Sequence, residues 1–356
     1  MGGGISGMLV ARMLANDHEV HLFEAEGYVG GHTHTVDVKV DGETCAADTG
    51  FMVFNDRTYP NFIRMLDLLG VPSRDSDMSF SVRCDRTGLE YQGGTLLGLF
   101  AQRRNLLRPS FYRMLRDILR FNREAPDLLD REDDLSTLDD YLAKHRYSPQ
   151  FAEHYLAPMG ASIWSTPTGK FRQFPARHTV GFFRNHGLLQ ISDRPQWKTI
   201  LHGAVKYVEA LLRPLDDQVR LNCPVDRVER HEDHVVVTPR GGESEIFDRV
   251  VLAAHADQSL AMLVDPSPAE REILGAIPYQ ANDIVLHTDT RLLPRTRRAW
   301  ASWNCHIATS EQPSVTLTYN LNLLQGHRPS EPILETLNPT MAIDPEKVLD
   351  RMTYHH

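Results

Sequence analysis

Apolar residues recur at helical spacing early in the chain. Residues 6–15 and 61–69 carry apolar side chains three and four positions apart. This spacing places them on one face of a helix. Gly70 follows the second segment, as expected where a helix ends. The pattern predicts two short amphipathic helices here and a third at residues 203–212.

Alternation of apolar and polar residues, which indicates a half-buried strand, appears in many short segments. In 33–40 the valines share one face, and Asp41-Gly42 predicts a tight turn into the next strand. Residues 247–254 are largely apolar and predict a buried strand. The other predicted strands are 19–23, 43–46, 78–83, 89–91, 219–221, 225–229, 234–238, 282–287 and 314–319.

Residues 95–160 are mostly helical and interrupt the strands as an insertion. Within them, residues 103–124 hold seven arginines against two acidic residues, so the net charge of this segment is +5. One interpretation is a solvated helix face above a buried apolar stripe. The other is a surface that approaches anionic lipid, which would make peripheral membrane contact. The arginines are Arg103, Arg104, Arg108, Arg113, Arg116, Arg120 and Arg123, and the apolar residues are Phe111, Leu115, Ile118, Leu119 and Phe121.

Helix boundaries are also predicted near the end of the insertion. Residues 135–137 predict a loop and a helix cap after the acidic run 130–134. A helix is then expected from Tyr141 to Gly160, and residues 161–167 break the helical region.

Composition narrows the class of protein. The chain has 356 residues, of which 41% are hydrophobic and 24% charged, as in an ordinary globular enzyme. A net charge of −9 argues against a general nucleic-acid binder. The four cysteines lie far apart, which disfavours a disulfide framework and a zinc site. The absence of a long apolar run and of a signal-peptide pattern predicts a cytoplasmic protein.

The first residues contain a glycine fingerprint for a dinucleotide. Gly2, Gly4 and Gly7 have G-x-G-x-x-G spacing. They permit a tight turn, close approach of a pyrophosphate and close packing of a helix, while Ile5–Ser6 would offer free N–H groups to the phosphates. Glu24 ends the next predicted strand, 17 residues after Gly7, near the offset expected for a carboxylate that binds the ribose.

One part of this fingerprint is missing, because only Met1 stands where a strand should precede the first glycine. We interpret this as a truncated start. The residues also leave open a glycine-rich tail before an ordinary helix, and a nicotinamide-binding domain.

A second glycine pair, Gly30-Gly31, follows Glu24 and precedes His32. This arrangement resembles the E-x(5)-G-G element of the amine-oxidase-like flavoproteins, which include monoamine oxidases, phytoene desaturases and protoporphyrinogen oxidases. The chain is most similar to bacterial predicted NAD/FAD-binding proteins of this superfamily, which look like the flavin domain fused to some plant cyclopropane fatty acid synthases. The resemblance continues in segments 48–60, 226–229 and 248–256.

The resemblance implies FAD as the cofactor and an α/β fold. We expect a Rossmann-like FAD-binding domain, built on a parallel sheet whose first strand is missing, with an interleaved α+β substrate domain. The FAD-binding domain would take 1–75 and 200–265. The substrate domain with its helical insertion would take 76–199 and 266–335. Residues 336–356 would be a truncated C-terminal segment, because the family's second flavin-contacting glycine segment is not found there.

The resemblance also assigns site residues. Cofactor contacts are expected at Gly2, Gly4, Ile5, Ser6, Gly7, Glu24, Gly30, Gly31, His32 and Val225. Val225 would meet adenine through its backbone, although an ordinary strand explains it equally well. Trp164 is expected near the substrate cavity as a core or wall aromatic.

Two polar positions complete the candidates. Asn55 and Arg57 are pocket candidates, and Arg57 could instead form an ion pair with Asp56. His32 and His34 form an H-x-H pair, but no cluster of cysteines or carboxylates accompanies them, so no metal is predicted. No catalytic base can be named.

The expected chemistry is hydride transfer from a substrate carbon to the flavin. Amine oxidases of this superfamily often place a lysine near the flavin, yet the matching segment 277–283 has none. This favours oxidation, desaturation or isomerisation of a hydrophobic, possibly fatty-acyl, small molecule over amine oxidation. The alternatives are an NAD-dependent dehydrogenase and a non-catalytic flavoprotein remnant that assists a lipid-modifying enzyme. The oligomeric state is not predicted.

Overall fold

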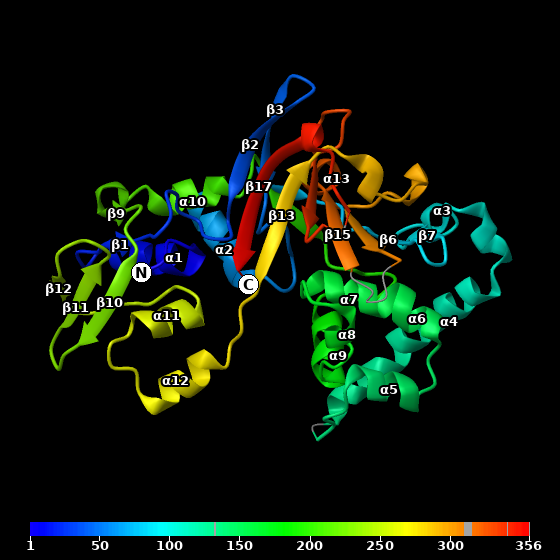
Figure 1. The fold of residues 1–356 in the computed structure, drawn as a ribbon, viewed down its shortest axis with the longest axis horizontal. Coiled ribbons are helices and arrows are strands. Elements are labelled where there is room, and N and C mark those ends of the chain that lie inside the picture. Colours follow the sequence, from blue (N-terminus) through cyan, green and yellow to red (C-terminus); the bar gives the residue numbers. More distant parts are fainter. Residues whose placement is uncertain (132, 310–314, 340, 356) are drawn as a thin grey trace.

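A seven-stranded sheet runs through the middle of the molecule (Figure 1). The computed structural model describes residues 1–131, 133–309, 315–339 and 341–355. The sheet is mostly antiparallel, and within those ranges β14 and β6 form its one parallel pair. Its strands, in spatial order, are β17 (Val348–His355), β13 (Ala281–His287), β16 (Leu334–Leu337), β15 (Val315–Asn320), β14 (Trp303–Ile307), β6 (Phe80–Cys84) and β7 (Leu89–Gln92).

On one side of this sheet lies a smaller α/β unit that includes the N-terminus (Figure 1, left). Helix α1 (Ile5–Leu14) precedes β1 (Leu22–Phe23), which pairs in parallel with β9 (Val219–Arg220). An antiparallel sheet of three strands, β10 (Val225–Arg230), β11 (Val235–Pro239) and β12 (Glu245–Phe247), adjoins it. Helices α11 (Ala256–Met262) and α12 (Pro268–Gly275) complete this side.

Short elements connect the smaller unit to the large sheet. Met8 of α1 packs in one apolar core with Leu66 and Tyr207, from α2 (Pro60–Leu69) and α10 (Val205–Leu212). The hairpin of β2 (Thr35–Val40) and β3 (Glu43–Asp48) packs against the sheet. The remaining connecting elements are β4 (Phe54–Asn55), β5 (Ser73–Asp75), β8 (Trp197–Ile200) and α13 (Leu321–Gln325).

A layer of helices lies below the other end of the sheet (Figure 1, lower right). Its members are α4 (Pro109–Glu124), α5 (Leu138–Lys144), α6 (Pro149–Phe151), α7 (Ala157–Ile163), α8 (Thr168–Phe171) and α9 (Ala176–Asn185). The short helix α3 (Leu96–Leu99) lies instead beside β7 (Figure 1). Aromatic side chains dominate the core of the layer, in which Phe121, Phe151, Phe171 and Phe183 are buried. This layer therefore has an apolar core of its own.

Most predicted helices and strands are present with boundaries shifted by a few residues. Gly70 has a φ of 67°, a left-handed conformation that favours glycine, so it ends α2 as predicted. The side chain of Thr137 caps α5 by accepting a hydrogen bond from the backbone of Asp140. The helix expected from Tyr141 to Gly160 is instead divided at Ser148-Pro149, because the residue before a proline disfavours helix. Residues 132 and 314, which fall in a predicted acidic run and strand, lie outside the described residues.

The predicted buried strand at 247–254 is wrong. Only Phe247 belongs to a strand, and Val251 is 46% exposed. The backbone of this segment bonds to Met1: the Met1 amino group donates to Val251 O, and Ala253 N donates to Met1 O, both at 2.8 Å. A strand needs a longer ladder than one residue can supply. Among the described strands of this unit, only β1 and β9 pair in parallel, and isolated parallel bridges join Gly4 to Gly30 and Val228 to Leu263.

Candidate functional site

The two glycine segments predicted to hold a cofactor meet in space. Gly4 is the N-cap of α1 and carries no capping side chain, so the first N–H groups of the helix lack a side-chain acceptor. Gly30 N donates to Gly3 O at 2.8 Å, and Gly30 pairs with Gly4 as an isolated parallel bridge. The N-terminus of α1 and the second glycine pair thus form one cradle of backbone.

Close approach of the backbone explains most of these glycines. A Cβ on Gly7 would lie 1.9 Å from Gly2 O, and one on Gly30 would lie 2.2 Å from Thr33 O. Gly2 and Gly31 also have positive φ, at 94° and 58°. Gly4 is different, because a Cβ there would meet nothing within 4 Å. The space in front of Gly4 is therefore open.

Glu24 directly follows β1 and turns its carboxylate toward the cradle. One of its oxygens accepts from Gly3 N at 2.5 Å, and the other accepts from Glu26 N at 2.9 Å. The side chain is nearly buried. Each oxygen keeps acceptor capacity for another donor. Glu24 therefore holds the glycine turn in place, and its binding of a ribose stays a prediction.

A group of rings follows the second glycine pair. The ring of His32 stacks on His255, and His255 stacks on Tyr279 with centroids 4.3 Å apart. Tyr354 lies edge-on to His32, and its hydroxyl is 2.8 Å from His34 Nδ1. His32 and His34 thus both contact neighbouring rings. Within the described part of the chain, no group of three or more His, Cys, Asp or Glu residues could hold a metal ion.

An apolar cavity of about 290 Å³ opens between the sheet and the helical layer. Phe80, Trp303 and Tyr319 line it from β6, β14 and β15. Met159 and Ile163 line it from α7, and Phe182 from α9, while the loop 50–53 closes another side. No Asp, Glu, Lys or Arg is among its described lining residues. The cavity therefore suits an apolar ligand.

The sheet register explains how the wall of this cavity forms. Phe80 pairs with Trp303, Trp303 with Tyr319, and Tyr319 with Glu335. Residues directly opposite each other on neighbouring strands point to the same face. The three aromatic rings thus form a row across the sheet, and Glu335 continues that row beyond Tyr319.

Two buried carboxyl groups lie at the end of this row. Asp48 accepts from Thr35 Oγ1 at 2.6 Å, Ala204 N at 2.8 Å and Gln325 Nε2 at 2.7 Å, yet burial raises its pKa to about 6. Glu335 Oε2 is buried without a hydrogen-bond partner among the described residues. Burial and the nearby Asp48 raise the pKa of Glu335 well above its usual value. Sequence analysis assigned no role to either carboxyl: Asp48 begins segment 48–60, which carries the family resemblance, whereas Glu335 belongs to no recognised motif.

The predicted pocket residues lie outside the lining of the cavity. Trp164 packs in the core of the helical layer, with its ring centroid 4.7 Å from that of Phe182, so it stands one side chain behind the wall. Asn55 is buried and its Oδ1 accepts from the backbone N–H of Arg57 and of Thr58. The Arg57 guanidinium pairs with Asp193 at 2.7 Å and not with Asp56.

The remaining candidates occupy the elements where they were expected. Ile5 and Ser6 start α1, with Ser6 exposed. Val225 starts β10, and its half-buried side chain packs against Phe23. Asn282, in the segment that lacks a lysine, is fully buried. Contacts of these residues with a cofactor stay predictions.

Comparison with known proteins places this arrangement in a recognised group. Residues 5–334 match the family model described as flavin containing amine oxidoreductase. Comparison with curated proteins found no match. No helix within the described ranges is both long and apolar enough to cross a membrane.

Several solved structures share the fold. A putrescine oxidase variant is 17% identical over 94% of this chain and 73% of its own, with a TM-score of 0.64. A CLA-producing fatty acid isomerase from P. acnes is 15% identical over 99% and 84%, with a TM-score of 0.65. Cyclohexylamine oxidase from Brevibacterium oxydans IH-35A is 15% identical over 94% and 73%, with a TM-score of 0.62.

Proposed function

Because the chain belongs to the flavin-containing amine oxidoreductase family, and is on that ground an FAD-dependent oxidoreductase, we propose that its substrate is a hydrophobic molecule with an extended carbon chain. The observation that carries this proposal is the apolar cavity, whose described lining residues include no Asp, Glu, Lys or Arg. A charged headgroup would have to lie outside this cavity, since burying an unpaired charge is costly.

The residues present fit FAD. The open space at Gly4, the N-terminus of α1 and the backbone of Gly30-Gly31 offer N–H donors to a pyrophosphate. Glu24 has acceptor capacity left for a ribose hydroxyl. FAD, when bound, supplies the group that takes a hydride from a substrate carbon. The nicotinamide alternative is set aside by the family match.

The chain's own residues would bind and orient the substrate. The row of Phe80, Trp303 and Tyr319 offers flat apolar surface along one side of an alkyl chain. Met159 and Ile163 face it from α7 and exclude water. The absence of lysine in 277–283 supports oxidation, desaturation or isomerisation of a carbon chain over amine oxidation. The fold itself does not decide between these reactions, since a fatty acid isomerase and amine oxidases share it alike.

The test combines flavin spectroscopy with product analysis. The purified protein, loaded with FAD, is mixed without oxygen with linoleic acid, a long-chain amine or putrescine. We expect either flavin bleaching or a changed fatty acid with linoleic acid, and neither with putrescine. Turnover of putrescine alone would contradict the hydrophobic substrate. A flavin spectrum with no turnover of any hydrophobic compound would support the non-catalytic alternative.

A further inference from the structure

One edge of the molecule exposes leucines that the proposed function does not use. Leu96 and Leu97 of α3 are 75% and 79% exposed. Leu106 and Leu107, in the 3₁₀ helix η1 (Arg103–Leu107), are 50% and 87% exposed. The ring of Tyr112 joins them, because its hydroxyl donates to Leu106 O at 3.0 Å. We call these five residues the leucine edge.

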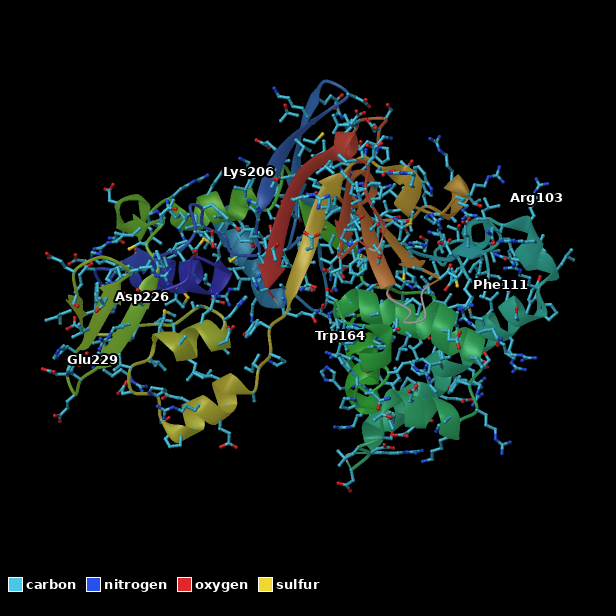
Figure 2. All side chains as sticks on the ribbon, in the orientation of Figure 1. Arg103, Phe111, Trp164, Lys206, Asp226 and Glu229 are labelled. Carbon is cyan, nitrogen blue, oxygen red and sulfur yellow. The ribbon has the colours of Figure 1, made fainter. Side chains whose placement is uncertain are left out.

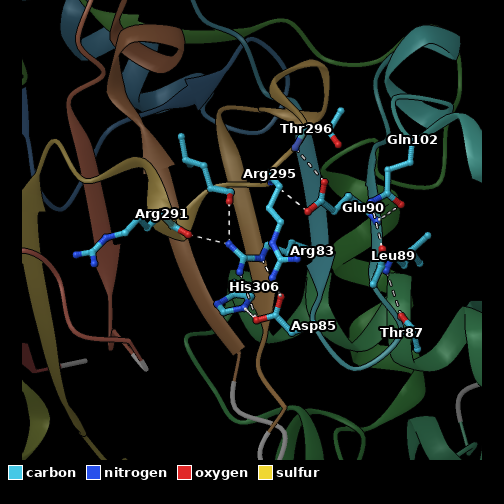
Figure 3. Close-up of polar contacts among 12 residues, drawn as sticks. Arg83, Asp85, Thr87, Leu89, Glu90, Gln102, Arg291, Arg295, Thr296 and His306 are labelled. Atoms are coloured by element: carbon cyan, nitrogen blue, oxygen red, sulfur yellow. Dashed lines mark hydrogen bonds and ion pairs between the residues drawn. The ribbon is translucent and has the colours of Figure 1, made fainter.

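The leucine edge is held outward by buried polar contacts. Asn105 is fully buried and donates to Glu90 O at 3.0 Å. Gln102 accepts from Glu90 N, and the Glu90 carboxylate accepts from Arg295 N and Thr296 N, all at 3.0 Å (Figure 3). These bonds tie the segment to β7 and to the loop after β13. The leucines therefore have a fixed, solvent-facing position.

Positive charge surrounds the leucine edge although the whole chain is acidic. From Arg86 to Arg116 the sequence has six arginines and one acidic residue, the buried Glu90, whereas the chain carries −9. Arg103 projects from the outer rim in Figure 2. Exposed Arg297 and Arg298 lie in the 3₁₀ helix η6 (Arg297–Ala299), which packs against α3 and β7.

We propose that the leucine edge docks on an anionic lipid bilayer, with its leucines among the headgroups and the surrounding arginines on the lipid phosphates. Exposed leucines ringed by arginine are the pattern of an interfacial membrane contact. Charge complementarity selects anionic lipid over a symmetric dimer through this surface, since in such a dimer the arginines of the two copies would face and repel one another. The proposal does not depend on which substrate occupies the cavity.

The leucine edge lies near the apolar cavity, so docking there would bring the cavity toward the membrane. Leu99 and Phe100 directly follow the exposed leucines and pack in the same apolar cluster as Phe80. Phe80 also lines the cavity. One apolar cluster thus connects the segment that carries the exposed leucines with the wall of the cavity, so a docked protein would hold this wall near the bilayer.

Co-sedimentation with vesicles tests this proposal. The FAD-loaded protein should bind vesicles of phosphatidylcholine mixed with phosphatidylglycerol, but not phosphatidylcholine alone. Because each arginine near such a surface contributes on the order of 1 kcal/mol, Arg103→Glu with Arg113→Glu should weaken binding by about 10- to 30-fold. Leu97→Asp with Leu107→Asp should weaken it at least about tenfold. Raising the salt from about 0.05 M to about 0.5 M should release the wild type.

Matched variants elsewhere separate docking from folding. Arg213→Glu with Arg271→Glu changes the charge equally at two exposed arginines, one just after α10 and one in α12, and Leu68→Asp alters a leucine that is 77% exposed on α2. These controls should bind vesicles like the wild type. Equal losses in them, or equal binding to neutral vesicles, would overturn the proposal. A change of oligomeric state in the leucine-edge variants without lipid would assign the edge to a second copy instead. The flavin spectrum, read in parallel, reports failure of the proposed function separately.

Discussion

Gly4 and Gly7 belong to one sequence motif but meet different surroundings, which lets them be tested apart. Gly7→Ala would bring a Cβ to 1.9 Å from Gly2 O, so we expect a loss of about 2 kcal/mol or more in unfolding free energy. Gly4→Ala meets open space and should change stability by no more than about 1 kcal/mol. It should weaken FAD binding at least about tenfold, because the Cβ enters the space expected for the pyrophosphate. Thermal unfolding without FAD and a flavin titration measure the two effects. Unchanged FAD affinity in Gly4→Ala would contradict the cradle.

Glu335 should make the stability of the protein fall as pH rises. Its pKa is raised in the folded state by burial and by Asp48, so the folded protein holds a proton that the unfolded chain releases. The stability linked to this proton is complete below the unfolded pKa and is lost as pH climbs toward the folded one. Glu335→Gln removes this loss and should be more stable than wild type by about 2 kcal/mol near pH 8, and by less near pH 5. Chemical denaturation at both values measures the difference. The exposed Glu346→Gln should follow the wild type, and a pH-independent effect of Glu335→Gln would refute this origin.

At the scale of single residues, the sequence predicted the glycines that belong to a motif, but not the buried carboxyls that come together only when the chain folds. Gly30 was recognised from spacing, and the structure brings it against Gly3 and Gly4. Glu335 and Asp48 stand 287 positions apart, and although Asp48 begins a segment that resembles the family, no pattern in the sequence links the two. Only the packing of a hairpin on a sheet makes them neighbours, so no local pattern could have indicated them.

At the scale of elements, local pattern predicted strands well where the partner strand is nearby in sequence. The hairpin at 35–48 was found because alternation and the turn residues agree. The strand predicted at 247–254 was wrong because apolar content alone does not supply a partner strand, and this segment has backbone bonds to Met1 instead. Strand β17 was missed for the opposite reason, since its residues alternate weakly and it is held by long pairing with β13.

A substitution in helix α7, which lines one side of the cavity, tests whether the cavity holds the substrate. Met159→Trp adds a ring to the face of α7 that lines the cavity. We expect turnover of long-chain substrates to fall at least about tenfold while stability changes by about 1–3 kcal/mol at most. FAD affinity should be unchanged, since the glycine cradle lies on other elements. Met13→Trp, at a position 70% exposed on α1, is the matched control. Loss of turnover in both variants would contradict the proposal that the substrate binds in this cavity.

At the scale of the whole molecule, the resemblance indicated a flavin fold, and the family match confirms it. The mixed α/β structure with its large, mostly antiparallel sheet agrees with the expected α/β fold, whereas the interleaved domains and their boundaries stay predictions. The large sheet could not be drawn from sequence alone. Its order joins β6 and β7 to β14, more than two hundred residues later, and such long-range pairing leaves no local trace.

Because the molecule has separate apolar cores, we expect bound FAD to slow amide hydrogen exchange in some parts of the chain and not in others. The cradle, β1 and the segment 250–256 are held by a few backbone bonds around Met1 and Gly2, whereas the helical layer has a dense aromatic core of its own. A ligand stabilises most the local openings that break its site. Added FAD should therefore slow amide hydrogen exchange at 1–31 and 250–256 and leave 109–185 nearly unchanged. Mass spectrometry of exchanged peptides measures this, with Gly4→Ala as the control that should show little slowing. Equal protection in the helical layer would mean that the two cores open together and that the molecule responds to the cofactor as one unit.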